Sequence, residues 1–256
     1  MNLFVLLKTV PDTVEELTVA ADNVSLDPEW LRFQLSDSDE HALEQALLLK
    51  EEHGGTVTVV ALDAPEVEEA LFQALAKGAD RAVKLTGELG EVRSLAAAKL
   101  FADFLKSAGA VGGDALILLR SQAIDDLEGE IGPFLADLLG LPYLGVVVLV
   151  APGDGGLTVT KEFAGGMRGE FSLPVAAVLG IQAAEKPPRY VPIAKVRAAM
   201  KASTLETVDV TPDSPVRFPI EKMYKPEAAG RAEMLEGSPE EVANRLVDLL
   251  ANQSLI

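Results

Sequence analysis

The stretch ALILLRSQAIDDLEGEIGP, residues 115–133, decides the fold expected for this chain. Its apolar start is typical of a strand buried on both faces of a parallel sheet. The chain then turns through SQAIDDLEGE into a helical stretch that ends near Leu139. Such a strand-to-helix turn presents backbone amides and a helix dipole, which favour an anion. Two interpretations follow: a phosphate-binding turn, or an acidic loop that only caps the helix with Asp125 or Asp126.

Further apolar runs on the N-terminal side repeat this strand pattern. They occupy residues 3–7, 56–62 and 81–85. Amphipathic stretches with helical spacing lie between the runs, and the sheet-forming and helix-forming patterns alternate along the chain. We therefore expect crossover connections and an α/β fold with a doubly wound, mostly parallel sheet. The expected helices cover residues 40–52, 67–77 and 93–106.

The second half of the chain has a different pattern, with short β-like runs divided by Gly-rich turns. It predicts a β-hairpin that returns to a last core strand. The β-like runs are residues 146–150, 157–163, 168–173 and 175–179.

Many prolines and few long apolar runs mark residues 181–235, whereas residues 239–250 predict a short helix capped by Ser238. We therefore expect an α/β domain over residues 1–184 and, over 185–256, a docking loop and a C-terminal arm with a terminal helix. A long arm without its own core favours a partner.

Composition excludes several classes of function. The 256 residues carry a formal net charge of -18 and no cysteine. Disulfides, thiolate catalysis and cysteine-held metal clusters are excluded, and a strongly negative surface repels nucleic acid and anionic lipid. No apolar run is long enough to span a membrane, and no leader-like pattern precedes the first strand, so we expect a cytoplasmic protein.

Common catalytic and nucleotide-binding signatures are absent from the sequence. It has no G-x-x-x-x-G-K-[ST], no G-x-G-x-x-G after the first strand, no G-x-S-x-G and no H-E-x-x-H. The two histidines, His41 and His53, are too far apart to share a metal. We expect no catalytic side chain and no metal site.

A basic stretch, KPPRYVPIAKVRAAMK at residues 186–201, interrupts this acidic chain and contains no acid. It is either the solvated face of a basic helix or a docking loop. Its prolines stand beside Tyr190, Val191 and Ile193, a combination typical of an apolar anchor with a charged rim. The segment at residues 36–40, SDSDE, is rich in residues that cap helices, and capping alone accounts for it.

Several sequence words together resemble the β subunit of electron transfer flavoproteins, in the same order along the chain. The similarity spans about residues 1–201 and, more loosely, the terminal helix. The words are LLKTVPDT, DEHALEQALLLKEEHGGTVTVVALDAP, LFQALAKGADRAVKL, SQAIDDLEGEIGPFLADLLGLP, LTVTKEFAGG, and PPRY followed by Met200 and Lys201.

The resemblance implies a heterodimer in which an α subunit holds FAD and this chain buries AMP in a fold of the adenine-nucleotide α-hydrolase type. A second FAD replaces AMP in electron-bifurcating relatives, whose loop differs from DDLEGE here, so AMP is favoured. The implied nucleotide-binding residues are Leu6, Ser36, Asp37, Ser38, Asp39, Asp63, Arg120, Ser121, Gln122, Ala123, Ile124, Asp125, Asp126, Leu127, Glu128, Gly129, Glu130 and Ile131.

The same resemblance implies partners. The basic stretch corresponds to the segment that docks on acyl-CoA dehydrogenases or similar donors, with Arg189 and Tyr190 beside an apolar anchor at Ile193. Glu162 corresponds to a glutamate that influences the mobile FAD domain. Electrons pass on to a quinone oxidoreductase, which implies a role in fatty acid oxidation, with no insertion of this chain into the membrane.

Departures from the family pattern concern the pocket and the docking segment. Ser36-Asp37 replace a common Asn-Pro pair, and Arg120 replaces a usual glycine, where it pairs either with a phosphate or with Asp126. Lys186-Pro187-Pro188 replace an Asn-Glu-Pro run, which leaves the dehydrogenase open.

Two other classes of function compete with an electron carrier. A stand-alone adenine-nucleotide-binding regulator of the universal-stress type shares the fold but requires a Gly- and Ser-rich phosphate loop. A nucleotide-processing enzyme requires a base or a metal cluster, for which Asp125 and Asp126 are the candidate magnesium ligands.

Overall fold

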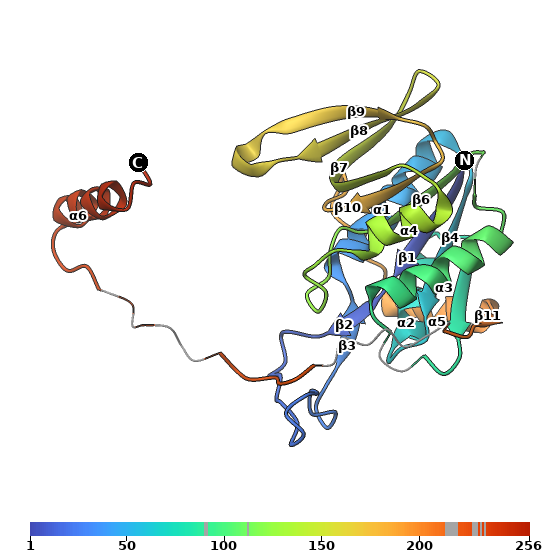
Figure 1. Ribbon diagram of the computed structural model, residues 1–256, viewed down its shortest axis with the longest axis horizontal. Helices are drawn as coiled ribbons and strands as arrows, with labels where there is room; N and C mark the ends of the chain where they lie inside the picture. Colours follow the sequence, from blue (N-terminus) through green and yellow to red (C-terminus); the bar gives the residue numbers. More distant parts are fainter. Residues whose placement is uncertain (90–91, 112, 213–219, 227–229, 231, 233) are drawn as a thin grey trace.

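The computed structural model describes residues 1–89, 92–111, 113–212, 220–226, 230, 232 and 234–256. A nine-stranded sheet forms the body of the protein (Figure 1). Its strands are, in spatial order, β11 (Glu206–Asp209), β5 (Arg81–Thr86), β4 (Thr56–Leu62), β1 (Asn2–Leu7), β6 (Ala115–Arg120), β10 (Ala177–Ile181), β7 (Tyr143–Gly153), β8 (Gly156–Glu162) and β9 (Arg168–Leu173).

The sheet is parallel from β11 to β7 and antiparallel from β7 to β9. The apolar runs at 3–7, 56–62, 81–85 and 115–119 all lie in central strands, and the fold is the doubly wound, mostly parallel α/β architecture that their pattern predicts. These strands are apolar on both sides because helices cover both faces of the sheet.

Helices α1 (Asp37–His53) and α2 (Val67–Lys77) pack on one face of the sheet, and α3 (Ser94–Ser107) and α4 (Ile131–Leu139) pack on the other. Their apolar stripes meet alternate residues of β1, so Leu3, Val5 and Leu7 face α1 while Phe4 and Leu6 face the opposite core. Helix α1 begins three residues before the expected residue 40 and takes in most of the acidic SDSDE segment.

The β-rich second half extends further than the single hairpin that we expected. β7, β8 and β9 form an antiparallel three-stranded apron, with a 3-10 turn (Ala164–Gly166) between β8 and β9. β10 then returns to the core between β6 and β7. A shift in register accompanies Val146, whose φ of 59° is unusual for a β-branched residue, so β7 bends at this point.

Three short strands escaped sequence reasoning because none contains an apolar run. β2 (Thr9–Pro11) and β3 (Phe33–Leu35) form a separate antiparallel ribbon, and β11 adds an edge to the main sheet. The segment expected to leave the domain at residue 185 therefore returns to it over residues 206–209.

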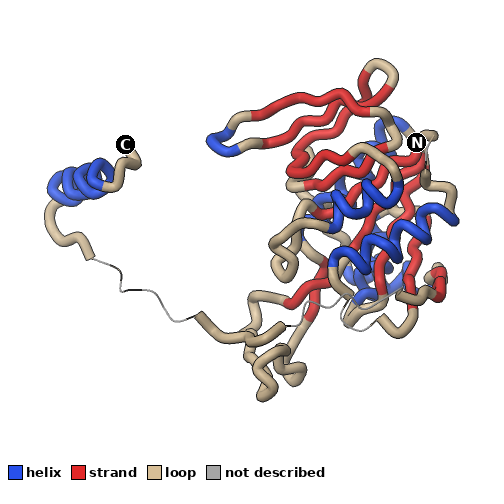
Figure 2. The backbone as a smooth tube through the Cα atoms, viewed as in Figure 1, coloured by secondary structure: helices blue, strands red, loops and turns tan. Residues whose placement is uncertain are grey.

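The basic stretch forms a helix, α5 (Ile193–Ala202), which packs beside α2. The chain ends with α6 (Pro239–Asn252), which stands apart from the body (Figure 2). The expected Ser238 cap is confirmed, since its hydroxyl accepts the Glu241 amide and the Glu241 carboxylate accepts the Ser238 amide. No described helix combines the length and apolar character needed to cross a bilayer.

Candidate functional site

The candidate site lies where the winding of the sheet reverses direction. From β1 the chain winds outward through β4 to β5, and it then crosses back to β6 on the other side of β1. Both neighbours pair with β1 in parallel, so the carboxyl ends of β1, β4 and β6 lie at one edge. Doubly wound sheets bind ligands in the crevice beyond this reversal.

Asp39 ties the carboxyl ends of β1 and β6 together at this edge. Its Oδ2 accepts the Lys8 amide at 2.9 Å and its Oδ1 accepts the Arg120 amide at 3.1 Å. Arg120 Nη1 lies 3.4 Å from Oδ2. The side chain of Asp39 is fully buried, and burial raises its pKa to about 6 against the opposing pull of the Arg120 and Lys8 charges and amides.

Arg120 pairs with Asp39, a protein partner that the sequence did not suggest. Asp126 instead accepts a hydrogen bond from Ser94 Oγ at 3.0 Å. Arg120 is only 4% exposed, and its Nε is the single buried side-chain nitrogen or oxygen in the described part of the chain that lacks a partner. A buried donor without an acceptor is costly, so this atom fits an anionic ligand.

The loop from Gln122 to Glu130 is acidic, but its aspartates are occupied. Asp125 accepts Lys8 Nζ at 2.7 Å, and the backbones of Ala123 and Asp126 bond each other reciprocally. Neither aspartate caps the following helix: α4 begins after Glu130, which makes no side-chain cap. Within the described residues, several loop amides find no acceptor in the protein, namely those of Gln122, Ile124, Asp125, Leu127, Glu128 and Glu130.

Ser121 and Gly129 shape this loop. The Ser121 hydroxyl donates to the Gly180 carbonyl at 2.7 Å and accepts the Val146 amide at 2.9 Å. Its one hydrogen is therefore used inside the fold. Gly129 has a φ of 62°, and a Cβ there would lie 2.6 Å from the Ser121 carbonyl oxygen, so the loop closes tightly only with glycine.

The other residues predicted from the sequence differ in their burial and in their partners. Leu6 is wholly buried in β1, so its side chain belongs to the core. Ser36 is buried and accepts the Asp39 amide through its carbonyl. Asp63 follows β4 and lies 3.5 Å from Lys84 Nζ. Ser38 is the second residue of α1, and Ile131 is the first residue of α4.

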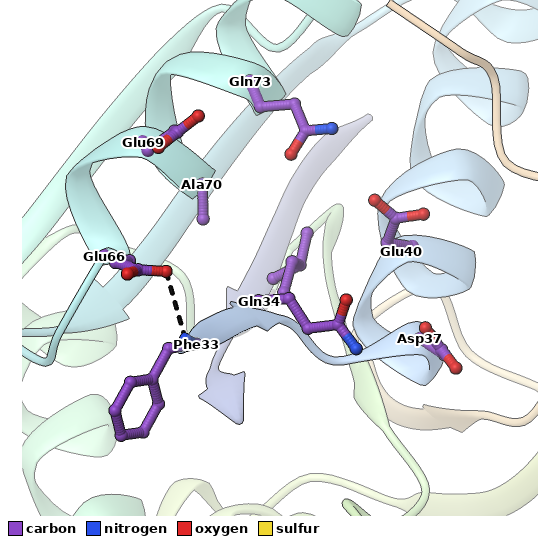
Figure 3. Close-up of a pocket in the computed structure, with 9 residues that line it drawn as sticks. Phe33, Gln34, Asp37, Glu40, Glu66, Glu69, Ala70 and Gln73 are labelled. Carbon is purple, nitrogen blue, oxygen red and sulfur yellow. Dashed lines mark hydrogen bonds between the residues drawn. The ribbon is translucent and has the colours of Figure 1, made fainter. Parts of the chain in front are cut away.

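Two hollows are lined by residues other than Lys8, Arg120 and the acidic loop. One, of about 380 Å³, lies between β3 and the starts of α1 and α2, where the carboxylates of Asp37, Glu40, Glu66 and Glu69 gather (Figure 3). Of the sequence-predicted residues, only Asp37 lines it. No group of three potential metal ligands occurs among the described residues.

The second hollow, of about 820 Å³, lies along the apron and is lined in part by Glu162, Arg168 and Glu170. Glu162 ends β8 opposite Arg168. Phe163, Met167 and Phe171 nearby are 42%, 67% and 38% exposed, so the apron presents apolar side chains to solvent.

The docking residues occupy a separate surface beside α1. Tyr190 and Ile193 are 85% and 66% exposed, respectively. Arg189 instead turns inward and pairs with Glu44 and Glu51 of α1.

Sequence reasoning missed Lys8, Glu44 and Tyr143. A signal existed for the first two. Lys8 directly follows a buried strand, and Glu44 interrupts the apolar face of a helix, where it is only 3% exposed. No sequence pattern indicated Tyr143, whose ring fits against Gly132, Gly145 and Gly180.

Comparison with known proteins connects these features to a family. The model described as "Electron transfer flavoprotein domain" matches residues 29–214. The chain is 30% identical to "Electron transfer flavoprotein subunit beta" of Bacillus subtilis over 266 positions, covering 100% of both proteins. The same-named protein of Clostridium acetobutylicum is 31% identical over 272 positions, again with 100% of both covered. That of Methylophilus methylotrophus is 27% identical, with 98% of each covered.

Proposed function

This chain belongs to the electron transfer flavoprotein family as a β subunit, and we propose that it joins an α subunit in an FAD-carrying heterodimer. The heterodimer takes electrons from acyl-CoA or related dehydrogenases and delivers them to a quinone reductase. The observation that carries the proposal is the end-to-end similarity to β subunits, which includes the C-terminal arm.

Bound FAD supplies the electron chemistry, and the contribution of this chain is positioning. The apron supports that role because its exposed Phe163, Met167 and Phe171 form an apolar surface suited to a protein partner. Glu162 and Arg168 beside it provide charges that orient a mobile flavin-bearing domain.

AMP is proposed for the edge where β1 and β6 diverge. Arg120 Nε and the unpaired loop amides supply donors for a phosphate. Lys8 and Ser94 hold Asp125 and Asp126, so these carboxylates are engaged elsewhere. Asp63 directly follows the neighbouring strand, β4, where a ribose or adenine is expected in a sheet wound in this way.

Co-purification tests the proposal. The chain is expressed together with the α-subunit gene, the complex is inspected for a flavin spectrum, and the denatured complex is analysed for released nucleotide. We expect a yellow heterodimer that releases one FAD and one AMP. Release of a second FAD in place of AMP would assign this pocket to a bifurcating type. A colourless homodimer that releases ATP would reject the electron carrier in favour of a stress-type regulator.

A further inference from the structure

Side chains of α1 hold the backbone that leads into the docking segment, residues 184–192. His41 Nδ1 accepts the Ala184 amide at 3.1 Å, and Gln45 Oε1 accepts the Glu185 amide at 3.1 Å. Glu44 Oε2 accepts the Arg189 amide at 2.9 Å. These side chains lie on one side of the helix, so the segment is bound along α1 before it turns away.

The strongest contact in this set joins Arg189 to Glu44. Arg189 Nε lies 3.0 Å from Glu44 Oε1 and 2.9 Å from Oε2, and Nη2 lies 2.8 Å from Oε1. Arg189 Nη1 reaches Glu51 on the next part of the helix. The pairing with both carboxylates raises the pKa of Arg189 and lowers that of Glu51. Charge-assisted bonds of this geometry are about twice as strong as neutral ones.

Burial alternates along the residues that follow. Val191 is 7% exposed, whereas Tyr190 before it and Ile193 after it are 85% and 66% exposed. Pro192 then occupies the N-cap position of α5. With Arg189 and Val191 both fixed, the intervening residue and the start of the helix have little freedom to turn inward.

We infer that Glu44 is a positioning residue for docking: it fixes Arg189 and so presents Tyr190 and Ile193 in the conformation that meets the donor dehydrogenase. The inference rests on the proposed function for the identity of the partner. A segment ordered before binding loses less conformational freedom on association, which strengthens the complex without adding a contact.

Glu44 differs in this respect from an ordinary structural ion pair. The Arg81–Glu206 pair has a similar distance, 2.7 Å, but its side chains are 52% and 47% exposed and lie on the β5–β11 edge. Removing that pair leaves the docking segment untouched. Glu206→Gln is therefore a matched control for Glu44→Gln.

Hydrogen exchange on this chain within the αβ complex tests the positioning directly. We expect Glu44→Gln to increase exchange across residues 184–192 by about tenfold, because the charged acceptor of the Arg189 amide is lost. Exchange in β1 and β6 should change little. Glu206→Gln should leave exchange at 184–192 as in the wild type. Unchanged exchange there in Glu44→Gln would overturn the inference.

Electron uptake by the αβ complex from a substrate-reduced acyl-CoA dehydrogenase gives the second measurement. We expect Glu44→Gln to raise the KM for the complex by about tenfold and to leave kcat within about twofold, with the flavin spectrum unchanged. Ile193→Ala should raise KM similarly without increasing exchange, since it removes the anchor and keeps the clamp. A Glu44→Gln complex with wild-type KM would overturn the inference.

Two further outcomes separate this inference from the proposed function. A wild-type complex that accepts no electrons from the dehydrogenase refutes the proposed donor, and the exchange measurement alone then decides the role of Glu44. Should Glu44→Gln fail to fold, Arg189→Gln removes the guanidinium bonds to Glu44 and Glu51 and keeps the bond from the backbone amide of residue 189 to Glu44. Faster exchange at 184–192 in that variant supports the clamp, and wild-type exchange overturns it.

Discussion

At the scale of single residues, Asp39 is the most informative side chain of the candidate site. It is a buried carboxylate that joins two strands through the amides of Lys8 and Arg120 and faces one guanidinium. Removing a carboxylate from water disfavours its ionised form, and here burial outweighs the neighbouring cations. The protein therefore binds a proton at this position more tightly than the unfolded chain does.

The stability of the protein should depend on pH through Asp39. Its folded pKa of about 6 lies above the ordinary value of 3.8, so its contribution is fully present below about pH 4 and is lost as the pH rises through 6. The interval between the two values corresponds to about 3 kcal/mol. Relative to Asp39→Asn, wild type should lose about that much unfolding free energy between pH 4 and 7. Urea titrations of both proteins measure the difference, and a constant difference would contradict the assignment.

The sequence placed Asp39, Arg120 and Asp126 in the candidate site but could not pair them correctly. The sequence left the partner of Arg120 open between a phosphate and Asp126. The order of strands decided otherwise, because β6 lies directly beside β1 and brings Arg120 to the start of α1. Pairing of this kind depends on tertiary contacts that spacing does not encode.

At the scale of elements, three glycines leave room for the Tyr143 ring between α4, β7 and β10. A Cβ on Gly180 would lie 2.7 Å from Tyr143 Oη and 3.2 Å from Ser121 Oγ, and one on Gly145 would lie 2.6 Å from Oη. The start of the candidate loop, at Ser121, therefore lies beside Tyr143, whose ring has space only because residues 132, 145 and 180 are glycines. Burial also raises the pKa of Tyr143.

Gly180→Ala should destabilise the protein by about 1 to 3 kcal/mol, because the added methyl group overpacks this site. Tyr143→Phe removes the closest atom, Oη, so the double variant should lose less stability than the sum of the single variants. Urea denaturation of the four proteins completes the cycle. If the losses of stability in the two single variants were strictly additive, the Tyr143 ring would not be the group that the added methyl group meets.

The stability of the terminal helix depends on its capping interactions more than on packing. α6 has no buried residue, and its capping box supplies the contacts that begin the helix. Ser238→Ala should reduce its local stability by about 1 kcal/mol and increase exchange of its first-turn amides. Ser254→Ala, beyond the helix, serves as the control. Equal exchange in both variants would show that the cap contributes nothing.

Elements were predictable where the pattern was long and apolar, as in β4 and α2, whose bounds match the expected 56–62 and 67–77. β11 was not, because ETVD is mostly exposed, contains no apolar run and owes its place to pairing with β5. The basic stretch was left open between a loop and a helix, and its helix begins only after Pro192.

At the scale of the whole molecule, charge is unevenly distributed. The chain has a net charge of -18, yet Lys186, Lys195, Arg197 and Lys201 flank the exposed Tyr190 and Ile193 along the chain. An acidic surface on a partner is attracted to this basic segment and is repelled by the rest of the chain. This difference in charge orients the partner before the two proteins touch.

Association of the αβ complex with its donor dehydrogenase should therefore weaken with salt. We expect the association rate to fall by about tenfold or more as ionic strength rises from about 10 mM to about 300 mM. Replacing Lys195 and Arg197 together by Gln should flatten that dependence. Stopped-flow flavin reduction measures both rates. A rate that rises with salt would mean that the basic surface faces away from the donor.

The two edge strands of the main sheet differ in how easily a strand of another chain pairs with them. β11, at one margin, has only four residues, with charges at both ends, and offers little for another strand to pair with. β9, at the other, is six residues long, and within the described part of the chain it pairs on one side only. Unsatisfied strand edges recruit further strands. Produced without its α subunit, the polypeptide is therefore expected to self-associate through β9, and adding the missing subunit should restore solubility.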